Sequence, residues 1–191
     1  MADASDPLDL TGKILIAMPG MGDPRFAHSV VFLCAHSSDG AMGLIVNKTM
    51  GKMTFSDLLE QLSIEESIKS RPMLLHFGGP VEGGRGFVLH SSEYRSQIST
   101  LPVDDFFAMT ATQDVLEEMA QGEGPDKALM ALGYSGWGPG QLEAEIAENG
   151  WLICDAGFDL VFDLADEKKW EAALNTLGID PLTLSASAGR A

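Results

Sequence analysis

The chain has 191 residues, of which 45% are hydrophobic and 21% are charged. This is the composition of a folded globular protein, and it excludes a disordered or fibrous one. The formal net charge is −16, which disfavours nonspecific binding to nucleic acid or to an anionic membrane. The length predicts one domain over residues 1–191, with mobile ends at 1–8 and 184–191.

The N-terminal residues MADASDPLDL lack the basic and apolar regions of a secretory signal. No apolar run approaches the roughly 18 residues of a membrane-spanning helix. We therefore expect a soluble, cytoplasmic protein that does not bind a membrane. Cys34 and Cys154 lie in apolar surroundings, which favours buried free thiols over a disulfide.

The first predicted elements are strands. Residues 13–18 (KILIAM) form an apolar run, and residues 29–36 and 41–47 form two more, separated by the turn sequence SSDG at 37–40. Apolar runs on both sides of a short turn predict a β-hairpin.

A helix is predicted next, over residues 54–62. Phe55, Leu58, Leu59 and Leu62 have the i, i+3, i+4, i+7 spacing of one helical face. Thr54 or Ser56 is the expected N-terminal cap.

The middle of the chain predicts more strands, at residues 73–77 and 86–90, joined by GGPVEGGR. Another strand is expected over 101–110. A helix follows at 113–120, with Thr112 as its cap.

The last third begins with residues 127–134, which are ambiguous between helix and strand, and the flanking proline and glycines favour strand. We then expect a helix at 140–148, strands at 151–154 and 160–164, and a helix at 167–176. Strands outnumber helices and are partly joined by hairpins, so the pattern predicts an α+β domain.

Three histidines, His36, His76 and His90, lie at or near predicted strand ends, where sites are often built. No CxxC or HExxH spacing accompanies them, so histidines held by structural hydrogen bonds are favoured over metal ligands. We assign no catalytic residue, no metal and no cofactor.

The glycine-dense segment 133–152, GYSGWGPGQLEAEIAENGWL, suggests two kinds of site, a serine nucleophile and an anion-binding turn. Ser135 lacks the glycine two residues later that a nucleophile elbow requires, because Trp137 stands there. An anion could bind the amides that open the helix, but Glu143 and Glu145 already oppose the helix dipole. A structural turn that packs Trp137 is favoured.

The remaining polar and glycine-rich signals fall in three predicted loops, at 23–26, 78–85 and 136–141. In one interpretation they are structural turns, and in the other they converge on a shared binding surface. The candidate residues of that surface are Asp23, Pro24, Arg25, Phe26, Asn47, Gly78, Gly79, Pro80, Arg85, Gly136, Trp137 and Gln141.

Three segments together resemble the bacterial YqgE/AlgH family. They are LTGKILIAMPGMGDPRFAHSVVFLCAHSSDGAMGLIVNK, FGGPVEGGRGFVLH and GYSGWGPGQLEAEIAENGWL, in matching order over nearly the whole chain. The resemblance implies an α+β fold in which a bifurcated, mostly antiparallel or mixed sheet contains a small closed β-barrel and is surrounded by helices. It implies no activity, because the family has no established catalytic residues.

The leading hypothesis is a non-enzymatic protein that binds a small molecule or a protein partner. The alternative is a transcriptional regulator that acts indirectly through a protein partner, since the net charge of −16 opposes direct DNA contact. A third possibility is an enzyme that uses the histidines at the strand ends. The sequence leaves the oligomeric state open.

Overall fold

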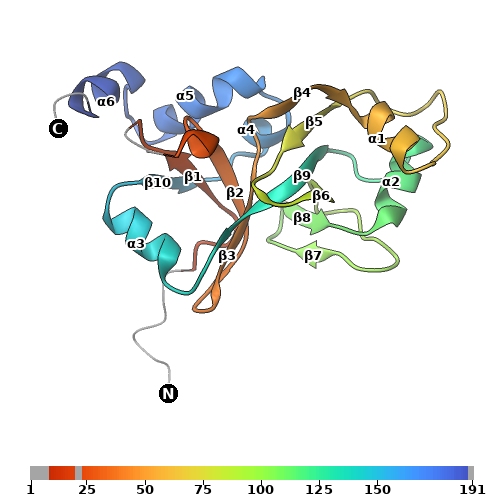
Figure 1. Cartoon of the computed structure of the whole chain (residues 1–191), viewed down its shortest axis with the longest axis horizontal. Helices are drawn as coiled ribbons and strands as arrows, with labels where there is room; N and C mark the ends of the chain where they lie inside the picture. The colour runs from red at the N-terminus through yellow and green to blue at the C-terminus, as the bar shows by residue number, and fades with distance from the viewer. Residues whose placement is uncertain (1–8, 20–22, 189–191) are drawn as a thin grey trace.

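One curled sheet runs through the molecule in the computed structural model, which describes residues 9–19 and 23–188 (Figure 1). Its strands follow the order β10-β1-β2-β3-β9-β6-β8-β7, with β5 paired to β9 and β4 paired to β5. The strand bounds are β1 Lys13–Ala17, β2 Val30–Ser37, β3 Gly40–Ile45, β4 Thr49–Thr54, β5 Leu74–Phe77, β6 Val81–Ser91, β7 Leu101–Pro102, β8 Phe107–Thr110, β9 Ala128–Trp137 and β10 Trp151–Asp155.

Six α-helices and one 3-10 turn surround the sheet within the described part of the chain. They are the 3-10 turn Pro24–Phe26, α1 Phe55–Gln61, α2 Gln113–Ala120, α3 Gln141–Ala147, α4 Phe158–Phe162, α5 Asp166–Thr176 and α6 Pro181–Ala188. The predicted α+β class is therefore confirmed. None of these helices combines the length and apolar character needed to cross a membrane.

The sheet divides at β9. The first part of this strand pairs with β6 and, in parallel, with β5, whereas its last residues, 135–137, pair with β3. The bifurcated sheet implied by the resemblance is thus present. The closed β-barrel that the resemblance implies is instead an open, curled half-barrel, because the end strands β10 and β7 are not neighbours in the strand order.

Strand side chains are buried on both faces of the sheet, which explains the nearly continuous apolar runs in the sequence. In β1, Ile14 and Ile16 enter a core inside the curl, whereas Leu15 and Ala17 enter a core on the outer face. We call the core inside the curl the first core. It is covered by Leu160 and Val161 of α4 and by Trp170 of α5.

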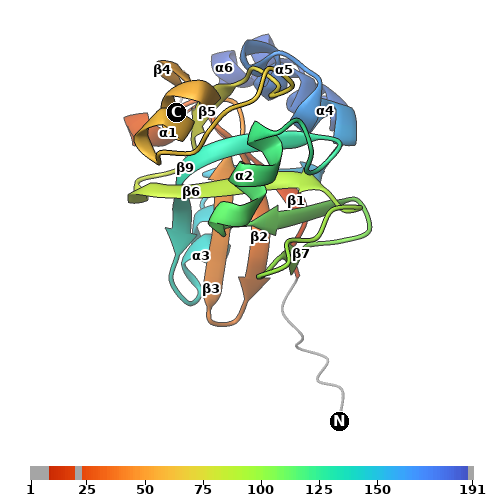
Figure 2. The ribbon, with the colours of Figure 1, turned by 90° about the vertical axis from the view of Figure 1, so that its right-hand side faces the viewer.

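The outer face carries two further cores. The second core packs α1 and α2 against Val88 of β6 and Met130 of β9, and Figure 2 shows α2 lying across these two strands. The third core packs Leu142 of α3 against Val31 of β2 and neighbouring strands. The helices therefore protect the sheet on its outer side, and one end of the curl stays open.

The predicted strand at residues 160–164 is wrong, because this segment lies in and just after helix α4. Phe158 and Phe162, four residues apart, pack edge to face with ring centroids 4.9 Å apart. Leu160 and Val161 point into the first core. A short apolar run does not distinguish a strand from a buried helical turn, and tertiary packing decides it here.

Three other boundaries need correction. The expected strand at 101–110 is two short strands, β7 and β8, because Asp104 accepts hydrogen bonds from the amides of Phe106 and Phe107 and holds a turn between them. Strand β6 begins at Val81, so most of the predicted 78–85 loop belongs to a strand. Likewise Gly136 and Trp137 end β9 instead of opening a loop.

Strand β4 was not anticipated, and part of the tail expected to be mobile forms α6 up to Ala188. The expected mobile end 1–8 and the last residues 189–191 lie outside the described residues.

The other predicted elements are present, with boundaries that shift by only a few residues. The turn at 37–40 joins β2 and β3 in a hairpin. Thr54 caps α1 in a capping box with Asp57. Thr112 precedes α2, but its hydroxyl donates to Asp114 and makes no cap hydrogen bond. Cys34 and Cys154 are buried free thiols, as predicted.

Candidate functional site

A groove with a volume of about 860 Å³ lies at the open end of the half-barrel. It is lined by the β2–β3 hairpin and by residues of β6, β7, β8 and β9. Most of its lining is apolar, including Met42, Val81, Phe87, Leu101, Met109 and Tyr134. The groove is an extension of the first core to the surface, because Phe87 and Met109 belong to both.

The rim of the groove carries Asp39, Glu82 and Arg85. The Arg85 guanidinium lies 3.8 Å from the Glu82 carboxylate and 5.1 Å from the centre of the Phe87 ring. Both side chains of the ion pair are about half exposed, so the pair adds little stability.

Residues 82–85 form an irregular arm of β6. Val81 pairs with Tyr134 and Gly86 pairs with Leu132, so the arm has more residues than the strand opposite and bulges out of the ladder. Glu82 has a positive φ of 49°, which is strained for a residue with a side chain. A Cβ added to Gly83 or Gly84 would meet nothing within 4 Å. The arm therefore has open space beside Gly83 and Gly84.

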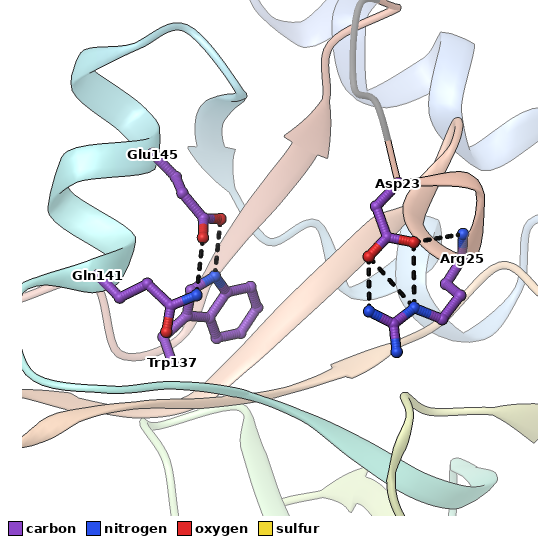
Figure 3. A network of polar contacts seen from close by, with 5 residues as sticks. All are labelled: Asp23, Arg25, Trp137, Gln141 and Glu145. Carbon is purple, nitrogen blue, oxygen red and sulfur yellow. Dashed lines mark hydrogen bonds and ion pairs between the residues drawn. The ribbon is translucent and has the colours of Figure 1, made fainter.

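Trp137 lies at the far end of the groove and is held by a separate network (Figure 3). Its indole Nε1 donates to Glu145 at 3.0 Å, and the indole of Trp151 donates to the same oxygen at 2.9 Å. Gln141 donates to the other carboxylate oxygen and accepts from the Gly138 amide. These contacts agree with the predicted turn that packs Trp137. The Gly138 amide already donates to Gln141, so it is not free to bind an anion.

The 23–26 segment does not line the groove. The Arg25 guanidinium donates to Asp23 at 2.7 Å, and no contact drawn in Figure 3 joins this pair to the Trp137 network. Hydrogen bonds from Arg25 lower the pKa of Asp23. Pro24 is exposed, whereas Phe26 packs edge to face on Trp151 at 5.8 Å.

The remaining candidates have structural roles or lie outside the groove. Gly78 and Gly79 are buried where the β5–β6 connection crosses β9, and Pro80 beside them is exposed. Asn47 accepts from the Val30 amide and donates to the His28 carbonyl, at 2.9 Å each. Of the twelve candidates, the structure brings Arg85, Gly136 and Trp137 into the groove lining.

His36 lines the groove but is fully engaged. Its Nδ1 accepts from the Leu10 amide at 3.0 Å, so Nε2 carries the proton and donates to Glu143 at 3.1 Å. The pKa of Glu143 lies below its usual range because its own backbone amide and the His36 ring donate hydrogen bonds to it.

His90 is buried and also engaged, with Nδ1 on the Ser91 carbonyl and Nε2 on the Thr110 hydroxyl, both at 2.8 Å. His76 contacts Asp166 in a different part of the molecule. Within residues 9–19 and 23–188, no group of three or more histidine, cysteine or acidic side chains could hold a metal ion.

Two side chains of nucleophilic type near the groove are buried. Burial raises the pKa of the Cys34 thiol to about 12, so it stays protonated at neutral pH. Ser135 is fully buried and donates to the Gly78 carbonyl at 3.1 Å.

Sequence reasoning missed most of the groove. Phe87, Met109 and Tyr134 lie in apolar strand segments, and the sequence pattern does not distinguish them from the other residues that pack in the first core. Glu82 was the one available signal, because it carries a charge inside the glycine-rich segment GGPVEGGR next to Arg85.

A family model described as AlgH-like matches residues 14–182. The UPF0301 protein of Ruegeria pomeroyi is 60% identical over 185 residues, which cover 96% of this chain and 100% of that protein. The UPF0301 protein of Paracoccus denitrificans is 54% identical over 185 residues, covering 96% of this chain and 97% of that one.

Solved structures share the fold. The solution structure of the AlgH protein from Pseudomonas aeruginosa is 43% identical, with a TM-score of 0.79 and 97% of each chain covered. A protein from Corynebacterium diphtheriae is 18% identical, with a TM-score of 0.71 and coverage of 96% of this chain and 94% of that one. At that identity the likeness concerns the fold alone.

Proposed function

We propose that this chain, which belongs to the AlgH-like family, is a non-catalytic binding protein whose groove takes an apolar group that lies beside a positive charge. The apolar group can belong to a small molecule or to a peptide segment of a protein partner. The observation that carries the proposal is the combination of an apolar groove with carboxylates on its rim.

The apolar part of the ligand is argued from size and lining. Ligand pockets commonly have volumes of about 300–1,000 Å³ and apolar walls, and mouths of β-barrels are a frequent location. The groove has about 860 Å³, and Phe87 and Tyr134 pack edge to face in its wall with ring centroids 5.6 Å apart. Val81 and Leu101 on the rim are 36% and 40% exposed, so apolar surface is available to a ligand.

The positive charge of the ligand is argued from the charged residues of the groove. Asp39 and Glu82 are acidic, and Arg85 already lies close to Glu82. The whole chain adds a net charge of −16, which attracts cations and repels anions. This negative charge would repel a carboxylate ligand, whereas it would favour binding of an amine or a lysine side chain.

The irregular geometry of the rim is a second observation that supports a binding role. The 82–85 arm is bulged, carries a strained residue and has free space around Gly83 and Gly84. Strained residues and bulges often lie at ligand-binding positions. The Glu82 carboxylate is therefore placed on an exposed, irregular segment at the rim, where a cation can reach it.

The proposal is tested with a pair of probes that share an aromatic body, 2-phenylethylamine and phenylacetate. Nuclear magnetic resonance titration should place both in the groove. The amine should bind at least about fivefold more tightly, because two unit charges about 4 Å apart interact by about 1 kcal/mol even at the dielectric constant of water. Equal affinities, or shifts confined to residues outside the groove, would exclude the proposed site.

A matched pair of variants separates the rim charge from the overall charge. Glu82→Lys should remove the preference for the amine, whereas Glu117→Lys, an exposed change on α2, should keep it. For the apolar wall, Leu101→Asp should weaken both probes, and Leu177→Asp is the control because Leu177 is 41% exposed away from the groove.

A selection experiment with peptides distinguishes the two kinds of ligand, a small molecule and a protein partner. Selection from a random peptide library should enrich sequences in which an aromatic or aliphatic residue is next to lysine or arginine. Enrichment that disappears with Leu101→Asp would favour a protein partner, as the indirect regulatory role requires. Binding of the amine without any peptide enrichment would favour a small molecule.

A further inference from the structure

Strand β6 extends beyond the end of its neighbour β8. The two strands pair in antiparallel register as far as Val88 and Thr110. After Thr110 the chain leaves the sheet and soon enters α2. Residues 81–87 of β6 therefore have no strand beside them on this side, whereas β9 lies along the other side.

The hydrogen-bond pattern identifies the backbone groups of β6 that face the missing neighbour. In an antiparallel ladder, successive residues direct their N–H and C=O groups to opposite neighbours. The Ser91 amide donates to the Lys127 carbonyl, on the β9 side. The Ser92 amide donates to the Phe106 carbonyl, on the β8 side. Gly86, five residues from Ser91 in the same register, therefore directs both backbone groups to the β8 side.

These two groups of Gly86 are open to another molecule. In the part of the chain that the structure describes, no hydrogen bond joins them to the segment after β8. Gly86 is partly exposed, and residues 81–85 before it are exposed. Such a donor and acceptor at an accessible sheet edge are a template for pairing with a second chain.

Two cavities flank this edge, one on each face of β6. The groove lies on the face of Arg85 and Phe87. A smaller cavity of about 150 Å³, which we call the α1–α2 cavity, lies on the opposite face, where Gly84 and Gly86 have no side chains. Ala111, the first residue after β8, lines both cavities, so they meet where β8 ends. The apolar walls of the α1–α2 cavity include Leu58, Leu62, Val88, Val115 and Leu116.

We propose that the groove binds a peptide segment of a protein partner as an added β-strand, which pairs with Gly86 in antiparallel orientation beyond the end of β8. This inference rests on the proposed function, because it specifies how the same groove takes a peptide. In strand addition, main-chain hydrogen bonds give affinity and pockets for alternate side chains give specificity. Here the alternate side chains of the peptide enter the groove and the α1–α2 cavity.

The two cavities select different side chains. The α1–α2 cavity is small and has apolar walls, so it takes aliphatic side chains in the space that Gly84 and Gly86 leave open. The groove presents the Phe87 ring together with the carboxylates of Asp39 and Glu82, which suits an aromatic residue and a lysine. The partner segment therefore has aliphatic residues at one set of alternate positions, and an aromatic residue and a lysine at the other.

The test uses the peptide acetyl-Thr-Leu-Phe-Val-Lys-Thr-amide with the full-length protein. In an extended strand its leucine and valine lie on one face, and its phenylalanine and lysine lie on the other. Two isomers of the peptide carry two backbone N-methyl groups each. One is methylated on leucine and valine, and the other on phenylalanine and lysine.

The expected result follows from the geometry of an antiparallel pair. The residue opposite Gly86 has its side chain on the same face and exchanges both hydrogen bonds with it. Methylation of leucine and valine should therefore weaken binding at least about fivefold, because it removes the donor that the Gly86 carbonyl needs. Methylation of phenylalanine and lysine should change the affinity by less than about twofold. Amide shift titration measures both, and the Gly86 amide proton should exchange more slowly in the complex.

A matched pair of variants tests the α1–α2 cavity. Leu62→Asp places a charge in its apolar wall and should weaken binding of the unmethylated peptide at least about fivefold. Leu177→Asp is the control, because Leu177 lines neither cavity and is 41% exposed, close to the 40% of Leu62.

Equal affinities of the two methylated isomers, or tighter binding of the isomer methylated on leucine and valine, would overturn strand addition. Failure of the unmethylated peptide to bind would overturn it as well. 2-Phenylethylamine separates these results from a failure of the proposed function. If the amine still shifts groove residues, strand addition alone is wrong, and if neither molecule binds, both proposals are wrong.

Discussion

At the scale of single residues, the Glu145 carboxylate is a hydrogen-bond acceptor shared by three side chains. Its carboxylate accepts from the buried indoles of Trp137 and Trp151 and from Gln141, and it thereby attaches α3 to β9 and β10. Trp137 and Trp151 are 7% and 2% exposed. Removal of their common acceptor would leave both indole N–H groups in an apolar environment.

Glu145→Ala should therefore lower the free energy of unfolding by about 2–4 kcal/mol, since each unsatisfied buried donor costs about 1–3 kcal/mol. Urea denaturation followed by tryptophan fluorescence measures this loss. Glu148→Ala, at the exposed end of the same helix, should change the stability by less than about 0.5 kcal/mol. Similar values for the two variants would mean that the indoles find other acceptors.

His90 carries the clearest dependence on pH. Burial lowers its pKa below the ordinary value of 6.5, against smaller opposing effects of the Ser91 carbonyl and Glu93. In the window between the lowered pKa and 6.5, the unfolded chain binds a proton that the folded protein does not. Stability should therefore fall as the pH decreases through this window, by at most about 1.4 kcal/mol per pH unit.

The variant His90→Gln should flatten the stability profile below pH 6.5, because glutamine does not titrate. The comparison needs urea midpoints of both proteins at several pH values. His28→Asn should retain the slope of the unchanged protein, and a slope that persists in His90→Gln would assign the dependence to other groups.

At the scale of elements, the crossing of β9 and the β5–β6 connection sets the path of the sheet. A Cβ on Gly79 would lie 2.1 Å from the backbone of Tyr134, and a Cβ on Gly133 would lie 2.4 Å from the Gly79 carbonyl. Gly133 also has a positive φ of 73°. The two backbones can approach so closely only because neither position has a side chain.

Gly79→Ala should consequently destabilise the fold by more than about 3 kcal/mol, or prevent soluble expression, because the contact is with backbone that cannot move aside. Gly84→Ala is the matched change, since its Cβ would meet nothing within 4 Å, and it should cost less than about 1 kcal/mol. Yield and urea midpoint distinguish the two. Equal tolerance would show that the crossing can open.

At the scale of the whole molecule, β9 contributes residues to all three cores or packs against them. We therefore expect the second core to unfold together with the first and third cores, in one transition. The tryptophans belong to the first and third cores, whereas the second core under α1 and α2 contains none. A change in the second core therefore tests the coupling from a distance.

Leu59→Ala removes a fully buried side chain of the second core and should cost about 2–5 kcal/mol. The transitions measured by tryptophan fluorescence and by far-ultraviolet circular dichroism should shift together. Leu62→Ala, at a position that is 40% exposed, should shift both by less than about 1 kcal/mol. A tryptophan transition that stays in place in Leu59→Ala would mean that the halves unfold separately.

The sequence by itself determined the α+β class, most elements and the family. These depend on local patterns: the SSDG hairpin turn, the 55–62 helical face and the three family segments are all readable within short windows. Of the candidate site, it identified Arg85, Gly136 and Trp137, because glycine and charge stand out in an apolar strand.

Only the tertiary structure decided that residues 160–164 belong to a helix and its end, that Gly79 and Gly133 serve a backbone crossing, and which candidates share a groove. It also brought His76 of β5 to Asp166 of α5, ninety positions further along the chain. The physical reason is common to all of these. Each depends on contacts between strands and helices distant in sequence, and a local pattern contains no information on which distant backbone or side chain will pack against it.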